Sequence, residues 1–156
     1  MQFRASAGII RSLHDSVYGT AIIDADNRAV HHFLEPLLRT STSELKLGIK
    51  GQPAPLATTL ETAFDSAARR KGLLGRTGLP EGAALVIAPC SAVHTFAMRF
   101  PIDVIFVRRN GQIVKLRRAM PPARMSAAIG AFAVVEMSAG SIERTNVKVG
   151  DHLFVG

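Results

Sequence analysis

A chain of 156 residues, 47% of them apolar, is long enough for one domain with a hydrophobic core and too short for two ordinary domains. Its single cysteine excludes an intrachain disulfide and is typical of a protein from a reducing compartment. The formal net charge of +7 arises mostly after residue 50. Such a charge favours anionic partners: nucleic acid, acidic proteins or lipid headgroups.

No segment has the pattern of a signal peptide or of a membrane span. Arg4 and Arg11 interrupt the apolar residues at the N-terminus, so no continuous apolar region forms there. The apolar runs elsewhere are only a few residues long, far below the length that crosses a bilayer. The sequence therefore predicts a soluble, cytoplasmic protein.

Residues 1–55 are weakly patterned. Within them, residues 46–50 alternate like an edge strand, and residues 51–55, Gly-Gln-Pro-Ala-Pro, have the composition of a linker. We expect residues 1–55 to be an N-terminal extension that packs on, or pairs with, the main body. Residues 56–156 are expected to form a single domain.

The clearest helix signal lies at residues 65–72. Asp65 is a good N-cap, the residues after it are helix formers, the last turn is cationic and Gly72 ends the segment. The pattern predicts one short helix.

Several short apolar segments then have the length of strands. They cover residues 83–88, 93–97, 102–107, 112–116, 132–137 and 152–155, with a short turn of helix near 141–144. Short strands joined by Gly, Pro and Asn turns indicate a mainly β fold with some α+β character. We predict a compact β-sandwich or partly closed barrel, with the short helix near 65–72 and a hairpin at 102–118.

The hairpin turns at residues 108–111, Arg-Arg-Asn-Gly, and its register has two alternatives. A two-residue loop places Asp103 opposite Arg118, and a three-residue bulged loop places it opposite Arg117. In either register we expect Asp103 to pair with an arginine across the ladder. Replacing that pair of arginines is then expected to destabilise the protein more than replacing the two arginines of the turn.

A series of motifs occurs in order along the second part of the chain. They are Arg-x-Lys-Gly-Leu-Leu-Gly-Arg (69–76), Pro-Cys-x-x-Val-His-Thr-Phe-x-Met (89–98), Arg-Phe-Pro-Ile-Asp (99–103), Phe-x-x-x-x-Gly (106–111), Val-Glu-Met-x-Ala-Gly (135–140) and Gly-Asp (150–151). Together they closely resemble the bacterial and archaeal domain of unknown function 192 family over about residues 56–156. The resemblance implies a compact, mainly β sandwich-like domain with one helix and no established activity.

Cys90 and His94 are the candidates for catalysis. Residues four apart on a strand share a face, and a thiolate beside an imidazole is the core of Cys–His nucleophilic catalysis, with Asp103 available to orient the imidazole. The alternative, which we favour, is a buried cysteine and a histidine bonded to backbone, because no signature of a catalytic cysteine surrounds Cys90. Whether the protein is an enzyme stays uncertain, with the balance against it.

The sequence indicates neither a metal nor a cofactor. One cysteine is present, and His31, His32 and His152 lie in segments unrelated to Cys90 and His94. The carboxylates Asp103 and Glu136 stand within apolar strands, where structural roles are favoured. Glu136 is expected either to face solvent or to meet Arg99 or Arg76.

A pocket is predicted around residues 90–103, because Pro101 stiffens the segment and pre-positions its side chains. The residues expected to line it are Arg76, Cys90, His94, Met98, Arg99 and Phe100. A structural role is expected for Asp103, Asn110, Gly111, Arg117, Arg118, Glu136, Gly140, Gly150 and Asp151.

Three functions remain open. The leading hypothesis is a non-catalytic β-domain that binds an anionic small molecule or an acidic protein segment near residues 90–103. The first alternative is a hydrolase or transferase that uses Cys90 and His94. The second is nucleic-acid backbone binding through the cations around the hairpin, namely Arg99, Arg108, Arg109, Lys115, Arg117, Arg118 and Arg124. This last function is less favoured, since aromatic residues are not interleaved for base stacking.

Overall fold

The structure is a computed structural model that describes residues 32–156. Residues 1–31, which include His31 and much of the expected extension, lie outside the described residues. The helices are α1 (Pro36–Arg39), the 3-10 turn η1 (Thr42–Glu44), α2 (Ser66–Lys71) and α3 (Ser141–Thr145). None of the helices between residues 32 and 156 has the length and apolar character needed to cross a membrane.

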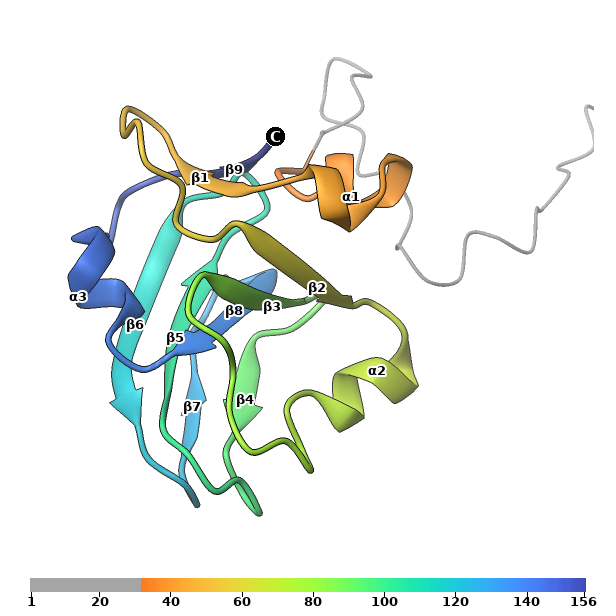
Figure 1. Cartoon of the computed structure of the whole chain (residues 1–156), viewed down its shortest axis with the longest axis vertical. Coiled ribbons are helices and arrows are strands. Elements are labelled where there is room, and N and C mark those ends of the chain that lie inside the picture. Colours follow the sequence, from red (N-terminus) through yellow and green to blue (C-terminus); the bar gives the residue numbers. More distant parts are fainter. Residues whose placement is uncertain (1–31) are drawn as a thin grey trace, which may run out of the picture. The chain divides into compact units, whose positions relative to one another are not determined.

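A five-stranded sheet forms the centre of the part of the chain formed by residues 32–156 (Figure 1). In spatial order its strands are β2 (Thr59–Ala63), β3 (Ala83–Ile87), β8 (Ala133–Ser138), β5 (Ile102–Val107) and β6 (Ile113–Met120). Only the β2–β3 pair is parallel. The prediction of a mainly β fold with some α+β character is confirmed, and the strands described here form open sheets without a closed barrel.

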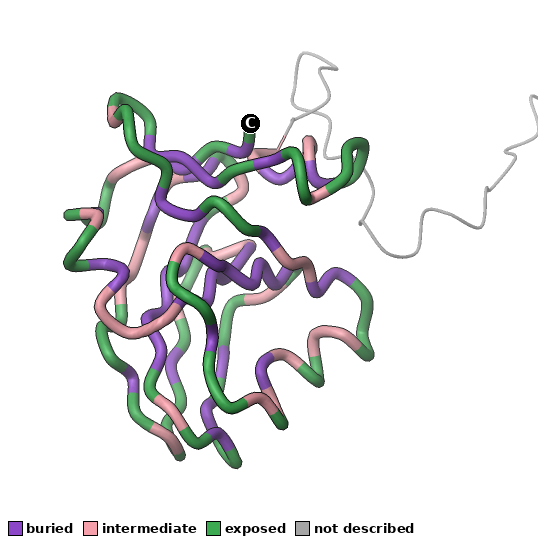
Figure 2. Tube along the Cα trace, viewed as in Figure 1, coloured by how far each residue is buried: buried purple, intermediate pink, exposed green. Residues whose placement is uncertain are grey.

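Two smaller sheets complete the fold. The first pairs β1 (Leu47–Ile49) with β9 (Leu153–Val155), and the second pairs β4 (Ala92–His94) with β7 (Met125–Ala127). Residues on one face of the central sheet pack with apolar residues of α1, β1, α3 and β9. Residues on the other face pack with those of β4 and of the segment after α2. The three inner strands are accordingly buried on both faces (Figure 2).

Helix α2 forms where the cap and stop signals predicted it. The Asp65 carboxylate accepts hydrogen bonds from the backbone amides of Ala67 and Ala68, at 2.9 and 2.8 Å. Gly72 ends the helix with a φ of 45°. Its last turn carries three cationic side chains, those of Arg69, Arg70 and Lys71.

Two strands have no counterpart in the sequence prediction. Strand β2, Thr-Leu-Glu-Thr-Ala, has only two apolar residues and lies at the edge of the sheet, beside β3. Strand β7 is three residues long and is defined mainly by its pairing with β4. Tertiary pairing, rather than local pattern, determines both strands.

The β5–β6 hairpin has the three-residue loop. The Arg108 amide donates to the Gln112 carbonyl at 2.8 Å, and the Gly111 amide donates to the Arg108 carbonyl at 2.9 Å. The register then shifts twice, between Phe106 and Val107 and again between Ile102 and Val104. Each shift moves the partner strand along by one residue, which neither of the two simple registers includes.

The predicted pairing of Asp103 with an arginine is therefore wrong. The Asp103 side chain is fully buried, and its carboxylate accepts from the amides of Ala119 (2.7 Å) and Ile142 (2.8 Å). Ile142 lies in the first turn of α3, so the carboxylate satisfies an amide that has no partner within the helix. Arg117 and Arg118 are both exposed, on the surface of β6.

This arrangement reverses the expected order of the arginine replacements. Arg117→Ala with Arg118→Ala is expected to change the free energy of unfolding by no more than about 0.5 kcal/mol, as for ordinary surface positions. Arg108→Ala with Arg109→Ala is expected to cost more, because the Arg109 guanidinium lies 4.1 Å from the centroid of the Phe132 ring. Urea unfolding of the two double variants measures the difference. A larger loss of unfolding free energy in the Arg117 and Arg118 variant would support an ion pair between one of these arginines and Asp103.

Gly111 is required where the hairpin turn meets β9. Its φ is 89°, and a Cβ atom built on it would lie 2.3 Å from the carbonyl oxygen of Leu153. We expect Gly111→Ala to cost at least about 2 kcal/mol in urea unfolding, from left-handed backbone strain and a backbone collision together. Gly150→Ala is the matched control, since Gly150 has a φ of 95° but open space around it. An equal loss of unfolding free energy in the two variants would contradict a collision between the added Cβ atom and the Leu153 carbonyl.

Candidate functional site

A small groove is lined by residues of α2, of the segment after it, of β4 and of the central sheet. We call it the α2–β4 groove. Its volume is about 80 Å³. The residues that line it are Arg69, Arg70, Lys71, Gly72, Leu73, Leu74, Ile87, Ala92, Val93, His94, Met98 and Glu136. It thus combines apolar walls, a cationic helix end and one buried carboxyl group.

Glu136 is the most unusual residue of the groove. It lies on the central strand β8, in register with Leu85 of β3 and Val104 of β5. Only 4% of its surface is exposed. Its Oε2 atom is buried and has no hydrogen-bond partner within residues 32–156. Neither of the two expected environments, solvent or a paired arginine, is therefore observed. A buried polar atom without a partner is costly and is often a mark of function.

Burial also changes the acidity of this carboxyl group. Loss of hydration raises the pKa of Glu136 to about 7, although the positive charge of Arg76 acts in the opposite direction. Near neutral pH the group therefore exists in both forms. When protonated it donates a hydrogen bond, and when ionised it only accepts. Perturbed carboxyl groups of this kind are concentrated at functional sites.

Arg76, one of the expected pocket residues, is held by another acid. Its guanidinium donates two hydrogen bonds to the Glu61 carboxylate, at 2.8 and 2.6 Å. The pair is partly exposed. This bidentate contact ties Arg76 to Glu61 of β2, and the charge of Arg76 acts on Glu136 without a direct hydrogen bond.

Cys90 and His94 make separate contacts. The half-buried thiol of Cys90 donates to the Ala92 carbonyl, with 3.1 Å between sulfur and oxygen. The exposed His94 ring stacks on Phe96, with 5.2 Å between ring centroids. Asp103 belongs to the opposite face of the central sheet, where it caps α3. The arrangement gives no support to a nucleophile with an oriented base.

The thiol is also expected to react slowly. Burial raises the pKa of Cys90, and the negative charge of Glu136 raises it further. We expect the alkylation rate to follow an apparent pKa above the value of about 8.5 that is usual for a free cysteine. Iodoacetamide kinetics against pH measure it, with the urea-unfolded chain as the control. An apparent pKa below that of the unfolded chain would support Cys90 as a catalytic nucleophile.

The remaining candidates divide between the groove and its surroundings. Met98 and His94 line the groove, as expected for pocket residues. Phe100 packs against the apolar cluster beneath it, and Arg99 is exposed outside the lining. Among residues 32–156, no three His, Cys, Asp or Glu side chains gather closely enough to hold a metal ion.

No pattern in the sequence indicated that α2 contributes to this site. Arg69, Arg70 and Lys71 were explained as cations that complement the helix end. The Arg-x-Lys-Gly motif at residues 69–72 was the available signal, but only the fold brings it beside Glu136.

Two solved structures share the fold. A protein of unknown function from Novosphingobium aromaticivorans has 24% sequence identity and a TM-score of 0.62, over 69% of this chain and 82% of its own. A "putative transcription regulator" from Sinorhizobium meliloti has 22% identity and a TM-score of 0.62, over 70% of this chain and 89% of its own. No curated protein matches the chain.

A family model gives a more specific result. The model of uncharacterized ACR proteins, domain of unknown function 192, matches residues 47–155. The match begins at β1 and includes every residue that lines the α2–β4 groove. Because it spans well over half of the sequence, the chain belongs to the domain of unknown function 192 family, as its ordered motifs indicated.

Proposed function

We propose that the protein is a non-catalytic binding domain that receives the acidic group of a small molecule or of a protein segment in the α2–β4 groove. The observation that carries this proposal is the buried, unpartnered Oε2 atom of Glu136 in a groove whose rim is cationic. A ligand that bonds to this oxygen removes the cost of leaving it unpaired.

The charge of the rim favours an anion. Arg69 is fixed by hydrogen bonds from its guanidinium to the Phe64 carbonyl (2.6 Å) and the Ser66 hydroxyl (3.3 Å). Arg70 and Lys71 are exposed and have no ion-pair partner in the described part of the chain. Three cations and one carboxyl group therefore line the same groove, and a carboxylate or phosphate would complement the cations.

Glu136 favours the binding of such an anion when its carboxyl group is protonated. A neutral carboxyl group donates its proton to an anionic oxygen, whereas an ionised one repels it. Affinity for an anion is therefore expected to fall as pH rises through the pKa of about 7.

The size of the groove limits what enters it. A volume of about 80 Å³ is well below that of a drug-sized pocket. It admits one functional group, such as a carboxylate, while the rest of the ligand stays outside. An acidic side chain of a partner protein meets this condition as well as a small metabolite does.

The test uses N-acetyl-L-glutamate and inorganic phosphate as probes, with ¹⁵N-labelled full-length protein. We expect saturable shifts of the amide signals of residues 69–74 and 92–94. The double variant Arg70→Glu, Lys71→Glu is expected to lose at least about tenfold in affinity. The matched control, Arg117→Glu with Arg118→Glu, changes the charge equally on β6 and is expected to bind normally. An equal loss of affinity in both variants would show that only the net charge of the protein matters, and would contradict binding in the α2–β4 groove.

The other two functions have less support. The raised pKa of Cys90 disfavours a thiolate nucleophile. Around the hairpin, Lys115 donates to the Ala127 carbonyl at 2.7 Å and Arg109 lies over Phe132, so these cations are already engaged. The name of the Sinorhizobium meliloti relative concerns that protein, and the likeness to it extends to the fold alone.

A further inference from the structure

We propose a second binding site, for a planar aromatic carboxylate, in a groove between α1 and β9. We call it the α1–β9 groove. Its volume is about 450 Å³, within the usual range for small-molecule pockets. It is independent of the α2–β4 groove, which is much smaller and shares no lining residue with it.

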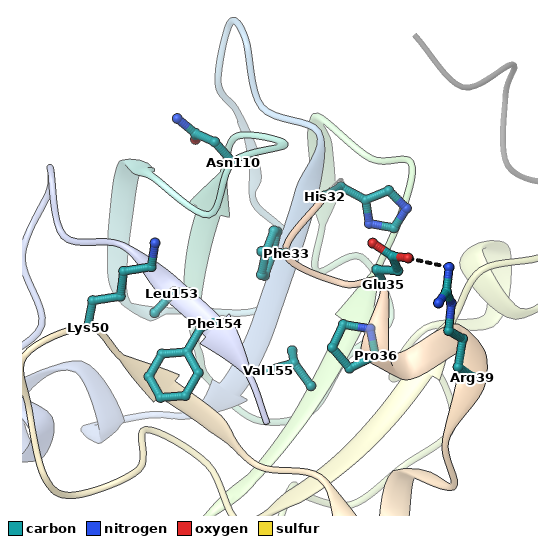
Figure 3. Close-up of a pocket in the computed structure, with 10 residues that line it drawn as sticks. All are labelled: His32, Phe33, Glu35, Pro36, Arg39, Lys50, Asn110, Leu153, Phe154 and Val155. Atoms are coloured by element: carbon teal, nitrogen blue, oxygen red, sulfur yellow. Dashed lines mark ion pairs between the residues drawn. The ribbon is translucent and has the colours of Figure 1, made fainter. Parts of the chain in front are cut away.

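The walls of the α1–β9 groove supply apolar surface from three segments of the chain. Phe33 precedes α1, Pro36 begins it, and Leu153, Phe154 and Val155 form β9. Figure 3 shows these side chains along the groove, with Val155 between Phe154 and Pro36. Aromatic and proline surfaces of this kind stack against a flat ring.

Phe154 is positioned by the residue beneath it. A Cβ atom added to Gly48 on β1 would lie 2.4 Å from the Cζ atom of the Phe154 ring. The glycine therefore lets the ring lie over the backbone of β1. The residue is still 41% exposed, so part of the ring is accessible to a ligand.

The polar groups of the α1–β9 groove are mainly donors. The Lys50 ammonium has no ion-pair partner within residues 32–156. The Asn110 side chain accepts from the Gln112 amide through Oδ1, at 3.0 Å, which leaves its NH₂ group as a donor. Arg39 and Glu35 form an ion pair of 2.5 Å and so offset each other. The uncompensated charge is that of Lys50, and it favours an anionic ligand.

These features together define the ligand class. A flat aromatic ring packs on the apolar side chains of the groove, and its carboxylate pairs with Lys50. A neutral aromatic molecule lacks the partner for Lys50, and a small inorganic anion lacks the apolar contact. Both parts are needed for binding.

The test titrates 2-naphthoate into the full chain and follows naphthyl fluorescence, which no tryptophan obscures because the chain has none. We expect saturable binding, and at least about tenfold weaker binding to Lys50→Met. Lys148→Met removes an equally exposed lysine elsewhere and is expected to bind normally. Gly48→Ala moves the Phe154 ring and is expected to weaken binding without touching the charge.

Two further arms make the outcome decisive. The amide 2-naphthamide, which has no charge, is expected to bind more weakly than 2-naphthoate by a similar factor. The variant Arg70→Glu, Lys71→Glu is expected to bind 2-naphthoate normally, since it changes only the α2–β4 groove. Absence of saturable binding below about 1 mM would overturn the proposal. So would equal affinity in Lys50→Met and Lys148→Met, or a loss confined to the α2 variant.

Discussion

Glu136→Gln is expected to stabilise the protein by about 3 kcal/mol above about pH 8 and to change its stability little below about pH 4. The carboxyl group has a pKa of about 7 in the folded protein, against 4.5 for the ordinary side chain. Between these values the folded state holds a proton that the unfolded state has released. The stability of the wild-type protein therefore falls as pH rises through this window and stays reduced above it. Glutamine resembles the neutral carboxyl group and cannot ionise.

Denaturant midpoints across the pH range measure this effect. Glu143→Gln is the control, because Glu143 is exposed on α3 and its replacement leaves Glu136 in place. The wild type and Glu143→Gln should show the same decline, whereas Glu136→Gln should not. Parallel pH profiles for the wild type and Glu136→Gln would show that Glu136 ionises normally, and would remove the chemical basis of the proposed site.

Asp103→Ala is expected to lower the free energy of unfolding by about 3 kcal/mol. The carboxylate is fully buried and accepts from two backbone amides, those of Ala119 and Ile142. Alanine leaves both donors without this partner, and the Ile142 amide has no access to solvent that would replace it. The substitution therefore loosens the start of α3 and the end of β6 together.

A second capping aspartate supplies the comparison. Asp65 also accepts from two backbone amides, but it is exposed, so Asp65→Ala is expected to cost only about 1 kcal/mol. Asp103→Asn retains one good acceptor oxygen and should fall between the two. If Asp103→Ala cost no more than Asp65→Ala in urea unfolding, burial would not be what makes this carboxylate important.

Local sequence signals were sufficient for the elements that depend on neighbours in the chain. The cap at Asp65 and the stop at Gly72 specify α2 without help from the rest of the fold. The apolar run of β3 and the largely apolar runs of β5 and β8, each with one carboxylate, indicate strands buried on both faces. The family motifs then identified the domain that contains them.

Features that depend on distant contacts could not be predicted in the same way. Two register shifts in the β5–β6 hairpin decide what Asp103 meets, and neither leaves a recognisable mark in the sequence. The buried state of Glu136 depends on α2 and β4, which cover it from elsewhere in the chain. The α1–β9 groove combines residues near both ends of the described unit, so no linear motif spans it.

The most direct test of the α2–β4 groove is the pKa of Glu136 itself, measured by ¹³C NMR of its carboxyl carbon with and without N-acetyl-L-glutamate. The free protein should give a value near 7. Because an anionic ligand prefers the protonated carboxyl group, linkage requires the value to rise when the probe is bound. A pKa that is near the ordinary value, or that stays unchanged or falls with the probe, would contradict the binding of an acidic group at this site.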